Sequence, residues 1–297
     1  MTDFATAPVR STGRMSSRSV LPLVGITPFF LFAILFLVAP TALLLAGAFF
    51  NSDGQFTFQN LFDLARPEII NSFVLTIKIS ALSAILGALF GFILAYAAVS
   101  SGLPKWIRPT LMTFSGVASN FAGVPLAFAF IATLGRLGLV TTALINILGF
   151  NIYDAGFNLL DFWGLTITYL YFQIPLMVLI MTPAIDGLKP EWREASTILG
   201  STKFQHWRYV ILPILWPSLV GSTLLLFANA FGAVATAFAL TNSSLSIVTI
   251  LLFAQIRGDV FHNPGLGYAL ALGMVIITGA SNLAYIMLRG RAERWMK

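Results

Sequence analysis

Charged residues and cysteines are scarce in this sequence. Only 9% of its 297 residues are Asp, Glu, Lys or Arg, whereas about 25% is usual in soluble domains, and 58% are hydrophobic. There is no cysteine, which excludes disulfides, thiol catalysis and metal sites with cysteine ligands. The two histidines, His206 and His262, have no spacing to other ligand residues that is typical of a metal site, and we interpret both as surface residues.

The few charges leave long uncharged gaps, and a membrane-spanning helix needs about 20 consecutive apolar residues. These gaps predict an all-α membrane protein, with one transmembrane domain over residues 21–288. Its six transmembrane helices are expected at about 22–49, 70–99, 109–134, 160–184, 213–239 and 266–288. We also expect a break at 241–244, a short apolar piece at 245–255, and an interfacial helix at 137–153.

The basic residues indicate how these six helices are oriented. With both termini on one side, thirteen Lys and Arg residues fall on that side and three on the other, and the positive-inside rule makes the richer side cytoplasmic. The thirteen are Arg10, Arg14, Arg18, Lys105, Arg108, Lys189, Arg193, Lys203, Arg208, Arg289, Arg291, Arg294 and Lys297. We therefore predict cytoplasmic tails at 1–20, which we expect to be disordered, and at 289–297.

The net charge of +6 and the sequence pI near 9.8 follow from this topology. Because the basic residues are spread over the cytoplasmic loops and tails, with no cluster on one soluble face, we expect no nucleic acid partner. The predicted outer loops are net negative by about three charges, which weakly favours a cationic partner or substrate.

Small residues and prolines interrupt the predicted helices. Gly87 and Gly91 have GxxxG spacing and continue to Ala95, a pattern that lets two helix backbones pack closely. We interpret this stripe as a packing surface first and as a hinge second. Pro125 follows Asn120 and Gly123, so a kink or break is expected within 109–134, and a broken membrane helix is tolerated where it lines a cavity.

The predicted cytoplasmic loop at 186–213 contains a short helix. Pro190 suits a helix start, Glu191 and Glu194 lie in the first turn where the helix dipole favours anions, and Gly200 is placed to end the helix. Helical spacing puts Trp192, Ala195, Ser196 and Leu199 on one face. An isolated helix of about ten residues is marginal in water, so it must dock. The surface on which it docks is either this chain's own helix ends, the lipid, or a cytoplasmic partner.

Five polar residues fall inside the predicted helices: Lys78, Asn120, Tyr169, Gln173 and Asn229. Polar side chains in the membrane are unfavourable unless they find partners. Lys78 either reaches outward to the interface, or faces a cavity or an acid such as Asp161 or Asp63. For the other four, hydrogen bonding between helices is the first interpretation, and lining a translocation path is the second.

The loop carries a pattern of twenty residues: Glu194-Ala195-Ser196, three residues, Gly200, nine residues, then Val210-Ile211-Leu212-Pro213. It resembles the EAA-x3-G-x9-I-x-L-P signature of permeases of binding-protein-dependent ABC importers, with Ser196 and Val210 as small departures. Three further stretches are similar to that family, namely Asn71-Ser72, Gly91 to Tyr96, and Gly265 to Ala271. Residues 56–64 and 186–188 most resemble its spermidine/putrescine branch, whose relatives serve phosphonates, ferric iron and thiamine.

This resemblance implies a type I fold in the bacterial inner membrane and a transport subunit, not an enzyme. It implies four further subunits or proteins: a second permease subunit, two ATPase subunits that hold the ATP and Mg, and an extracytoplasmic solute-binding protein. The residues implied to contact the ATPase or to transmit its motion are Glu191, Glu194, Ala195, Ser196, Leu199, Gly200, Leu212 and Pro213. Polyamine is the implied cargo.

The residues themselves allow a test of this implication. The chain has no GxxxxGK[ST] phosphate loop, so it cannot bind ATP by that route, and we expect no cofactor in it. The two halves show no inverted repeat, which argues against a self-sufficient secondary transporter. A rhomboid-like hydrolase would need a Ser and a His within the helices, and both histidines lie outside them. A stand-alone channel would not need the twenty-residue pattern.

Overall fold

The computed structural model describes residues 20–51, 54–100, 104–242, 244–257 and 264–295, which form helices and their connections. His262 and nearly all of the predicted tail at 1–20 lie outside these ranges. The helices are α1 (Val20–Ala33), α2 (Ala39–Gly47), α3 (Gln59–Asp63), α4 (Pro67–Ser100), α5 (Ile107–Asn120), α6 (Val124–Leu134), α7 (Leu139–Leu148), α8 (Phe162–Asp186), α9 (Pro190–Ile198), α10 (Lys203–His206), α11 (Leu212–Phe231), α12 (Val234–Thr241), α13 (Val248–Arg257) and α14 (Pro264–Trp295). Two π-helical segments, Ile34–Val38 and Trp207–Ile211, join α1 to α2 and α10 to α11.

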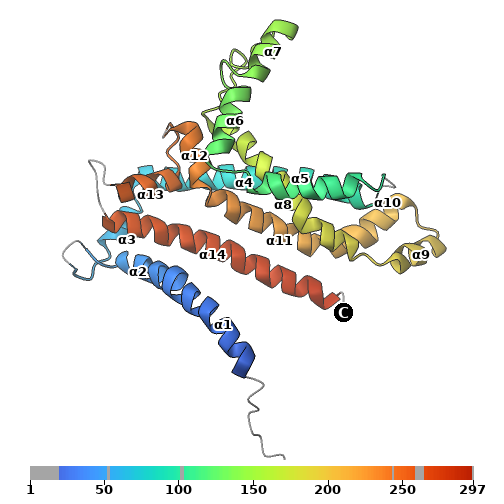
Figure 1. Ribbon diagram of the computed structural model, residues 1–297, viewed down its shortest axis with the longest axis horizontal. Helices are drawn as coiled ribbons and strands as arrows, with labels where there is room; N and C mark the ends of the chain where they lie inside the picture. Colours follow the sequence, from blue (N-terminus) through green and yellow to red (C-terminus); the bar gives the residue numbers. More distant parts are fainter. Residues whose placement is uncertain (1–19, 52–53, 101–103, 243, 258–263, 296–297) are drawn as a thin grey trace, which may run out of the picture.

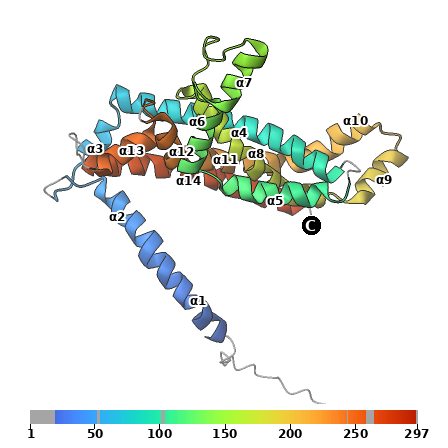
Figure 2. The ribbon, with the colours of Figure 1, turned by 45° about the horizontal axis from the view of Figure 1, so that its top comes forward.

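Six helical stretches are long and apolar enough to cross a membrane, as the sequence predicted. Four of them, α4, α8, α11 and α14, run side by side with α5 and form a bundle (Figure 1). The short helices α9 and α10 lie at one end of this bundle, and α3 and α13 lie at the other (Figures 1 and 2). We call these the α9 end and the α13 end.

The bundle is held together by close contact between α4 and α8. A methyl group placed on Gly91 would lie 2.5 Å from Met177 Cβ, and one on Gly87 would lie 2.7 Å from Gln173 Cβ. Ala95 continues this surface and is fully buried. The predicted packing role of the Gly87, Gly91 and Ala95 stripe is therefore confirmed, because only glycine leaves room for the neighbouring backbone.

The third predicted span, 109–134, is not one helix. α5 ends at Asn120 and α6 begins at Val124, with Gly123 at φ +75° between them, so the break expected near Pro125 is present. A backbone with that φ is strained for residues other than glycine. The apolar stretch of span length at this point is 124–148, which includes α7 and overlaps the predicted span only in α6.

The fifth predicted span, 213–239, also differs. α11 ends at Phe231 and α12 begins at Val234, so the helix is interrupted at Gly232 and Ala233. At its other end, the helical run starts ten residues earlier than predicted, at Lys203. The predicted break at 241–244 and the short apolar piece after it are confirmed, since Asn242 is left-handed with φ 44° and α13 follows.

Two parts extend away from the bundle. α6 and α7 project from its side as an arm, and α1 diverges from it while the end of α2 packs on α14 (Figures 1 and 2). The base of the arm is fixed by Tyr153, whose hydroxyl donates to the Leu134 carbonyl at 2.8 Å and whose ring lies 5.4 Å from the Arg136 guanidinium carbon. Much of the apolar surface of α1 and of the arm is exposed, as expected of helices that meet lipid or another chain.

Candidate functional site

The predicted loop helix is present as α9 and begins and ends where the sequence indicated. Pro190 is its first residue, Lys189 precedes it in an extended conformation, and Glu191 lies in its first turn. The chain leaves the helix through Gly200, which has φ +76°. Because other residues rarely adopt that φ, Gly200 sets the direction in which the chain continues toward α10.

The faces of α9 differ in part from the prediction. Glu191, Glu194 and Ala195 are exposed, and Ile198 and Leu199 at its end are each 86% exposed. Ser196, which the sequence grouped with Ala195 and Leu199, is turned inward and only 8% exposed. The outward surface, which we call the α9 outer face, therefore consists of Glu191, Glu194, Ala195, Ile198 and Leu199.

Ser196 contacts His206 on the inner side of the loop. The Ser196 Oγ lies 2.8 Å from His206 Nδ1 and donates to the Arg193 carbonyl at 2.9 Å. His206 is half-buried, and this contact with Ser196 adds a structural role to the surface position that the sequence indicated. This contact joins α9 to α10, the first turn of the next helical run.

That helical run continues without interruption from Lys203 to Phe231. Its start is fixed by a capping box, in which the Thr202 hydroxyl accepts from the Gln205 N–H at 3.2 Å and Gln205 Oε1 accepts from the Thr202 N–H at 2.8 Å. Leu212 and Pro213 lie inside the run, directly after the π-helical segment. α10 and α11 are therefore parts of one continuous helical run.

An ion pair lies beside the loop. The Arg108 guanidinium, at the start of α5, donates to the carboxylate of Asp186 at the end of α8. The ion pair joins the end of α8 to the start of α5, and both of these helix termini lie at the α9 end of the bundle. Both side chains are partly exposed, so we assign this pair a geometric role and little stability.

The two interrupted helices meet at the middle of the bundle. The Gly123 N–H, at the break between α5 and α6, donates to Thr236 Oγ1 in α12 at 2.7 Å. The Tyr169 hydroxyl in α8 donates to the Ala233 carbonyl, at the break between α11 and α12, at 2.7 Å. These bonds satisfy backbone groups that the breaks leave free, as a membrane interior requires.

An open hollow of about 430 Å³ lies at these breaks, and we call it the central hollow. Asn229, Gly232 and Ala235 are exposed in its wall. None of the described residues that line it is charged; they are Ser119, Ala122, Gly123, Phe172, Ala228, Asn229, Gly232, Ala233, Val234, Ala235 and Thr236. It can therefore offer hydrogen bonds and apolar contacts to a solute.

The structure brings only some of the five polar candidates to this hollow. Asn229 lines it, and Asn120 is exposed beside it at the end of α5, where its amide donates to the Gly116 carbonyl at 2.9 Å. Tyr169 and Gln173 are buried, and Gln173 Nε2 donates to the Leu226 carbonyl at 3.1 Å. The Gln173 bond and the bond from the Tyr169 hydroxyl to the Ala233 carbonyl both join α8 to the chain segment of α11 and α12. They confirm the first interpretation of these two residues, which was hydrogen bonding between helices.

Lys78 lies on the surface of α4 and is exposed. Asp63, one of its predicted partners, instead forms an ion pair with Arg66 at 2.8 Å. Within the described part of the chain, the ion pairs found are this one and Arg108 with Asp186, so Lys78 belongs to neither. The same part of the chain contains no group of three or more His, Asp and Glu residues that could hold a metal ion.

The sequence reasoning missed Thr236, Ser119 and Gly232 as lining residues of the central hollow. Small hydroxyl residues are common in membrane helices and usually bond to their own helix, so their identity carries little signal. The glycine and proline at 123 and 125 were the available signal for the first break. No proline or charge marks the second.

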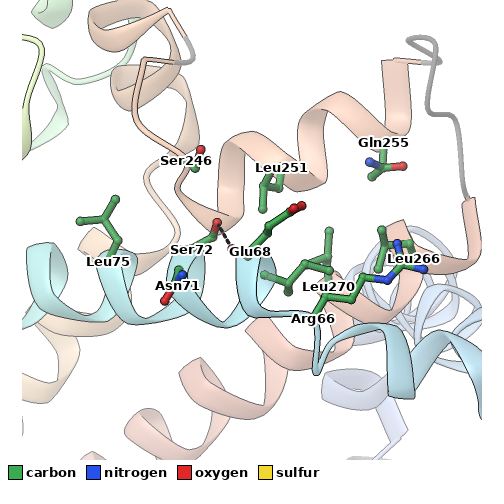
Figure 3. Close-up of a pocket in the computed structure, with 11 residues that line it drawn as sticks. Arg66, Glu68, Asn71, Ser72, Leu75, Ser246, Leu251, Gln255, Leu266 and Leu270 are labelled. Carbon is green, nitrogen blue, oxygen red and sulfur yellow. Dashed lines mark hydrogen bonds between the residues drawn. The ribbon is translucent and has the colours of Figure 1, made fainter.

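A further hollow of about 720 Å³ lies at the α13 end (Figure 3). It is bounded by α13, by the start of α4 and by the start of α14. Leu251, Leu266 and Leu270 contribute apolar walls, while Arg66 and Glu68 stand at the start of α4 (Figure 3). The Ser72 hydroxyl, which also lines this hollow, donates to the Glu68 carbonyl at 2.8 Å (Figure 3).

Known proteins resemble this chain in sequence and in fold. Residues 87–297 match the family described as binding-protein-dependent transport system inner membrane component. The chain is 26% identical over 279 residues to the sulfate transport system permease protein CysT of Salmonella typhimurium, covering 91% of this chain and 93% of that protein. It is 25% identical to the spermidine/putrescine transport system permease protein PotB of Haemophilus influenzae, covering 84% and 87%.

Solved structures show the same fold. A bacterial ABC transporter that imports the acidic polysaccharide alginate matches with a TM-score of 0.71 at 16% identity, over 94% of this chain and 97% of that one. The MetNI methionine ABC transporter, in inward-facing conformations, matches with a TM-score of 0.52 over 75% and 98%. The family match covers more than two thirds of the chain. The named relatives are permease subunits of ABC transporters, in which separate ATPase subunits hydrolyse the ATP. This multi-pass membrane protein therefore belongs to the family of inner membrane components of binding-protein-dependent transport systems, as an ABC importer permease subunit.

Proposed function

We propose that this chain forms half of a translocation path through the bacterial inner membrane, for a small solute delivered by an extracytoplasmic binding protein. The observation that carries the proposal is that α8 and α11 connect the two candidate sites. Both helices border the central hollow, and the loop with α9 joins their other ends. A partner that moves α9 would therefore move walls of the hollow.

The partner at the α9 end of this chain is proposed to be one ATPase subunit. A second ATPase subunit would bind the second permease chain, so that the transporter contains a pair. The α9 outer face presents Ile198 and Leu199, each 86% exposed, next to the carboxylate of Glu194. Exposed apolar side chains on a nine-residue helix favour docking into a groove of another protein. ATP and Mg would be held by those subunits.

The second permease subunit is proposed to meet the arm and the open side of the central hollow. Phe128 is 65% exposed and Ile147 79% exposed on α6 and α7, which leave the bundle on the side of the two breaks (Figure 1). Residues of the hollow such as Asn229 stay exposed in a single chain. A second copy or a related chain would close the path.

The binding protein is proposed to dock at the α13 end, where the leucine-walled hollow of Figure 3 opens beside Arg66 and Glu68. For the solute itself we keep polyamine as the proposal, with phosphonate, ferric iron and thiamine as alternatives in the same branch. Sulfate is a second candidate, supported by the Salmonella relative that matches nearly the whole chain. None of the described residues that line the central hollow is charged, so selectivity would rest mainly on the binding protein.

The experiment is co-purification of the chain with its ATPase subunits, followed by ATP-driven solute uptake in proteoliposomes. Glu194→Arg is expected to abolish both ATPase binding and uptake, because it reverses the charge on the α9 outer face. The matched control is Glu68→Arg, which reverses an exposed glutamate at the α13 end. It is expected to leave ATPase binding intact. Undiminished ATPase binding and uptake with Glu194→Arg would refute the proposed role of α9.

A further inference from the structure

A second face of α9 borders a hollow of about 750 Å³ that neither the α9 outer face nor the central hollow includes. It lies behind α9, between that helix, α10 and the ends of α4 and α8. Ser196, which is turned inward, and Ser201 belong to its wall. We call it the inner basic hollow.

The charges around this hollow are unbalanced. Lys189, Arg193 and Lys203, which are all exposed to solvent, line it with three positive charges. Asp186 is the one acid among the described lining residues, and its carboxylate is already paired with Arg108. Glu191 and Glu194 lie on the outer face of α9 and are not among the lining residues. An unpaired group of three cations around one concave site favours an anionic ligand.

A neutral donor is also placed there. The Ser201 hydroxyl oxygen is buried and makes no hydrogen bond to any described residue, although buried hydroxyls normally have a partner. A ligand with several acceptor oxygens would satisfy the serine and contact the cations at once.

The hollow is located where a membrane helix ends. α4 ends at Ser100 and α8 at Asp186, and Tyr96, Val99 and Ile185 from these helix ends form an apolar wall. A basic site with an apolar side at the end of membrane helices is suited to a phosphate group at the membrane surface. The same oxygens could come from a free phosphate in the surrounding solution.

We propose that the inner basic hollow binds a phosphate group, through Lys189, Arg193 and Lys203 with the Ser201 hydroxyl as a further donor. Occupancy would hold α9 against the ends of α4 and α8, because the cations come from the start of α9, its middle and the start of α10. The ligand is therefore expected to stiffen the connection between α9 and the bundle. This inference rests on the geometry of the loop alone and does not depend on the transported solute.

The test uses the full-length protein in nanodiscs and compares two sources of phosphate. In one arm the discs contain phosphatidylcholine with increasing phosphatidylglycerol, and retained lipid is counted by native mass spectrometry. In the other the discs contain phosphatidylcholine only, and binding of radiolabelled inorganic phosphate is measured by equilibrium dialysis. Saturable binding of one phosphatidylglycerol or of one phosphate per chain is expected, and the arm in which it occurs identifies the source.

The matched variants separate this site from general surface charge. Arg193→Gln/Lys203→Gln removes two lining cations and is expected to weaken binding by about tenfold or more, because hydrogen bonds to charged groups are strong. Lys105→Gln/Arg208→Gln removes two exposed cations at the same end that do not line the hollow, and is expected to change binding little. Ser201→Ala keeps every charge and is expected to weaken binding by a smaller factor.

Equal loss of binding in the two double variants would overturn the proposal in favour of nonspecific attraction. Absence of saturable binding by the unaltered protein in both arms would also overturn it, whatever the folding of the variants. If Arg193→Gln/Lys203→Gln lost only its affinity for the ATPase subunits, the cations would be docking residues for an acidic side chain of that partner, and the phosphate site would be refuted. Failure of Glu194→Arg to affect ATPase binding would leave this result unchanged, so the two proposals fail separately.

Discussion

Among the described residues, the contact between Ser196 and His206 is the only hydrogen bond that joins a side chain of α9 to a side chain of α10. We predict that His206→Ala loosens α9 and raises deuterium uptake over residues 190–199. ATPase affinity should fall by a few fold, since one hydrogen bond contributes about 0.5–1.5 kcal/mol. Hydrogen exchange by mass spectrometry and ATPase titration measure the two effects.

A double-variant cycle supplies the control for this prediction. Ser196→Ala removes the same bond from the other side and also loses the bond to the Arg193 carbonyl, so His206→Ala/Ser196→Ala should be little worse than Ser196→Ala alone. Fully additive effects of the two substitutions would mean that the bond does not connect the helices. The Thr202 capping box remains in all three variants, so the start of the helical run is kept.

At the scale of single residues, the sequence predicted backbone roles better than side-chain contacts. The positions of Pro190 and Gly200 at the two ends of α9 could be derived from the fixed φ of proline and the tolerance of glycine for positive φ. The contact of Ser196 with His206 could not, because it joins residues ten apart through a turn and follows no helical period. Which face of α9 is buried depends on that turn.

At the scale of helices, the pairing of α4 with α8 depends on Gly91. We predict that Gly91→Leu separates the two helices and lowers stability, because the new side chain would overlap Met177 Cβ and the Ile174 carbonyl. Overpacking of this kind costs about 1–3 kcal/mol. The measurement is the midpoint of thermal unfolding in detergent. Size-exclusion chromatography after heating reports how much folded protein remains at each temperature.

Gly116→Leu is the matched control for Gly91→Leu. Gly116 also lies in a bundle helix, α5, but apart from its chain neighbours and the adjacent backbone of its own helix, no atom of the described residues lies within 4 Å of a methyl group built there. Its substitution should leave the unfolding midpoint nearly unchanged. Equal destabilisation by both variants would indicate a general effect of leucine in these helices, and the close contact would not be its cause.

The interruptions of α5–α6 and α11–α12 show what apolar gaps alone cannot predict. An uncharged stretch fixes how much chain lies in the membrane, but a straight helix and a broken one have the same composition. Gly123 and Pro125 marked the first break. The second break, at Gly232 and Ala233, depends on partners far away in sequence, since Tyr169 supplies the hydrogen bond to the Ala233 carbonyl.

At the scale of the whole molecule, six apolar helical stretches follow from charge spacing, which is why their number could be predicted. The twenty-residue loop pattern likewise fixed the family, since its residues are close in sequence. The solute could not be derived, because the described residues lining the central hollow carry no charge and the hollow is completed, as we propose, by another chain. Relatives of similar identity transport solutes as different as sulfate and spermidine or putrescine, by their names.

The orientation of the molecule is the last prediction, and the absence of cysteine makes it directly testable. Lys105, Arg108, Lys189, Arg193, Lys203 and Arg208 all lie at or beside the α9 end, so the positive-inside rule places that end in the cytoplasm. Single cysteines at the exposed positions Lys105 and Phe62 report the α9 and α13 ends, and the cysteine-free parent measures the background. In intact cells, a membrane-impermeant maleimide should label Phe62→Cys, whereas Lys105→Cys should react only after permeabilisation. The reverse pattern would place α9 outside, where no cytoplasmic ATPase could reach it.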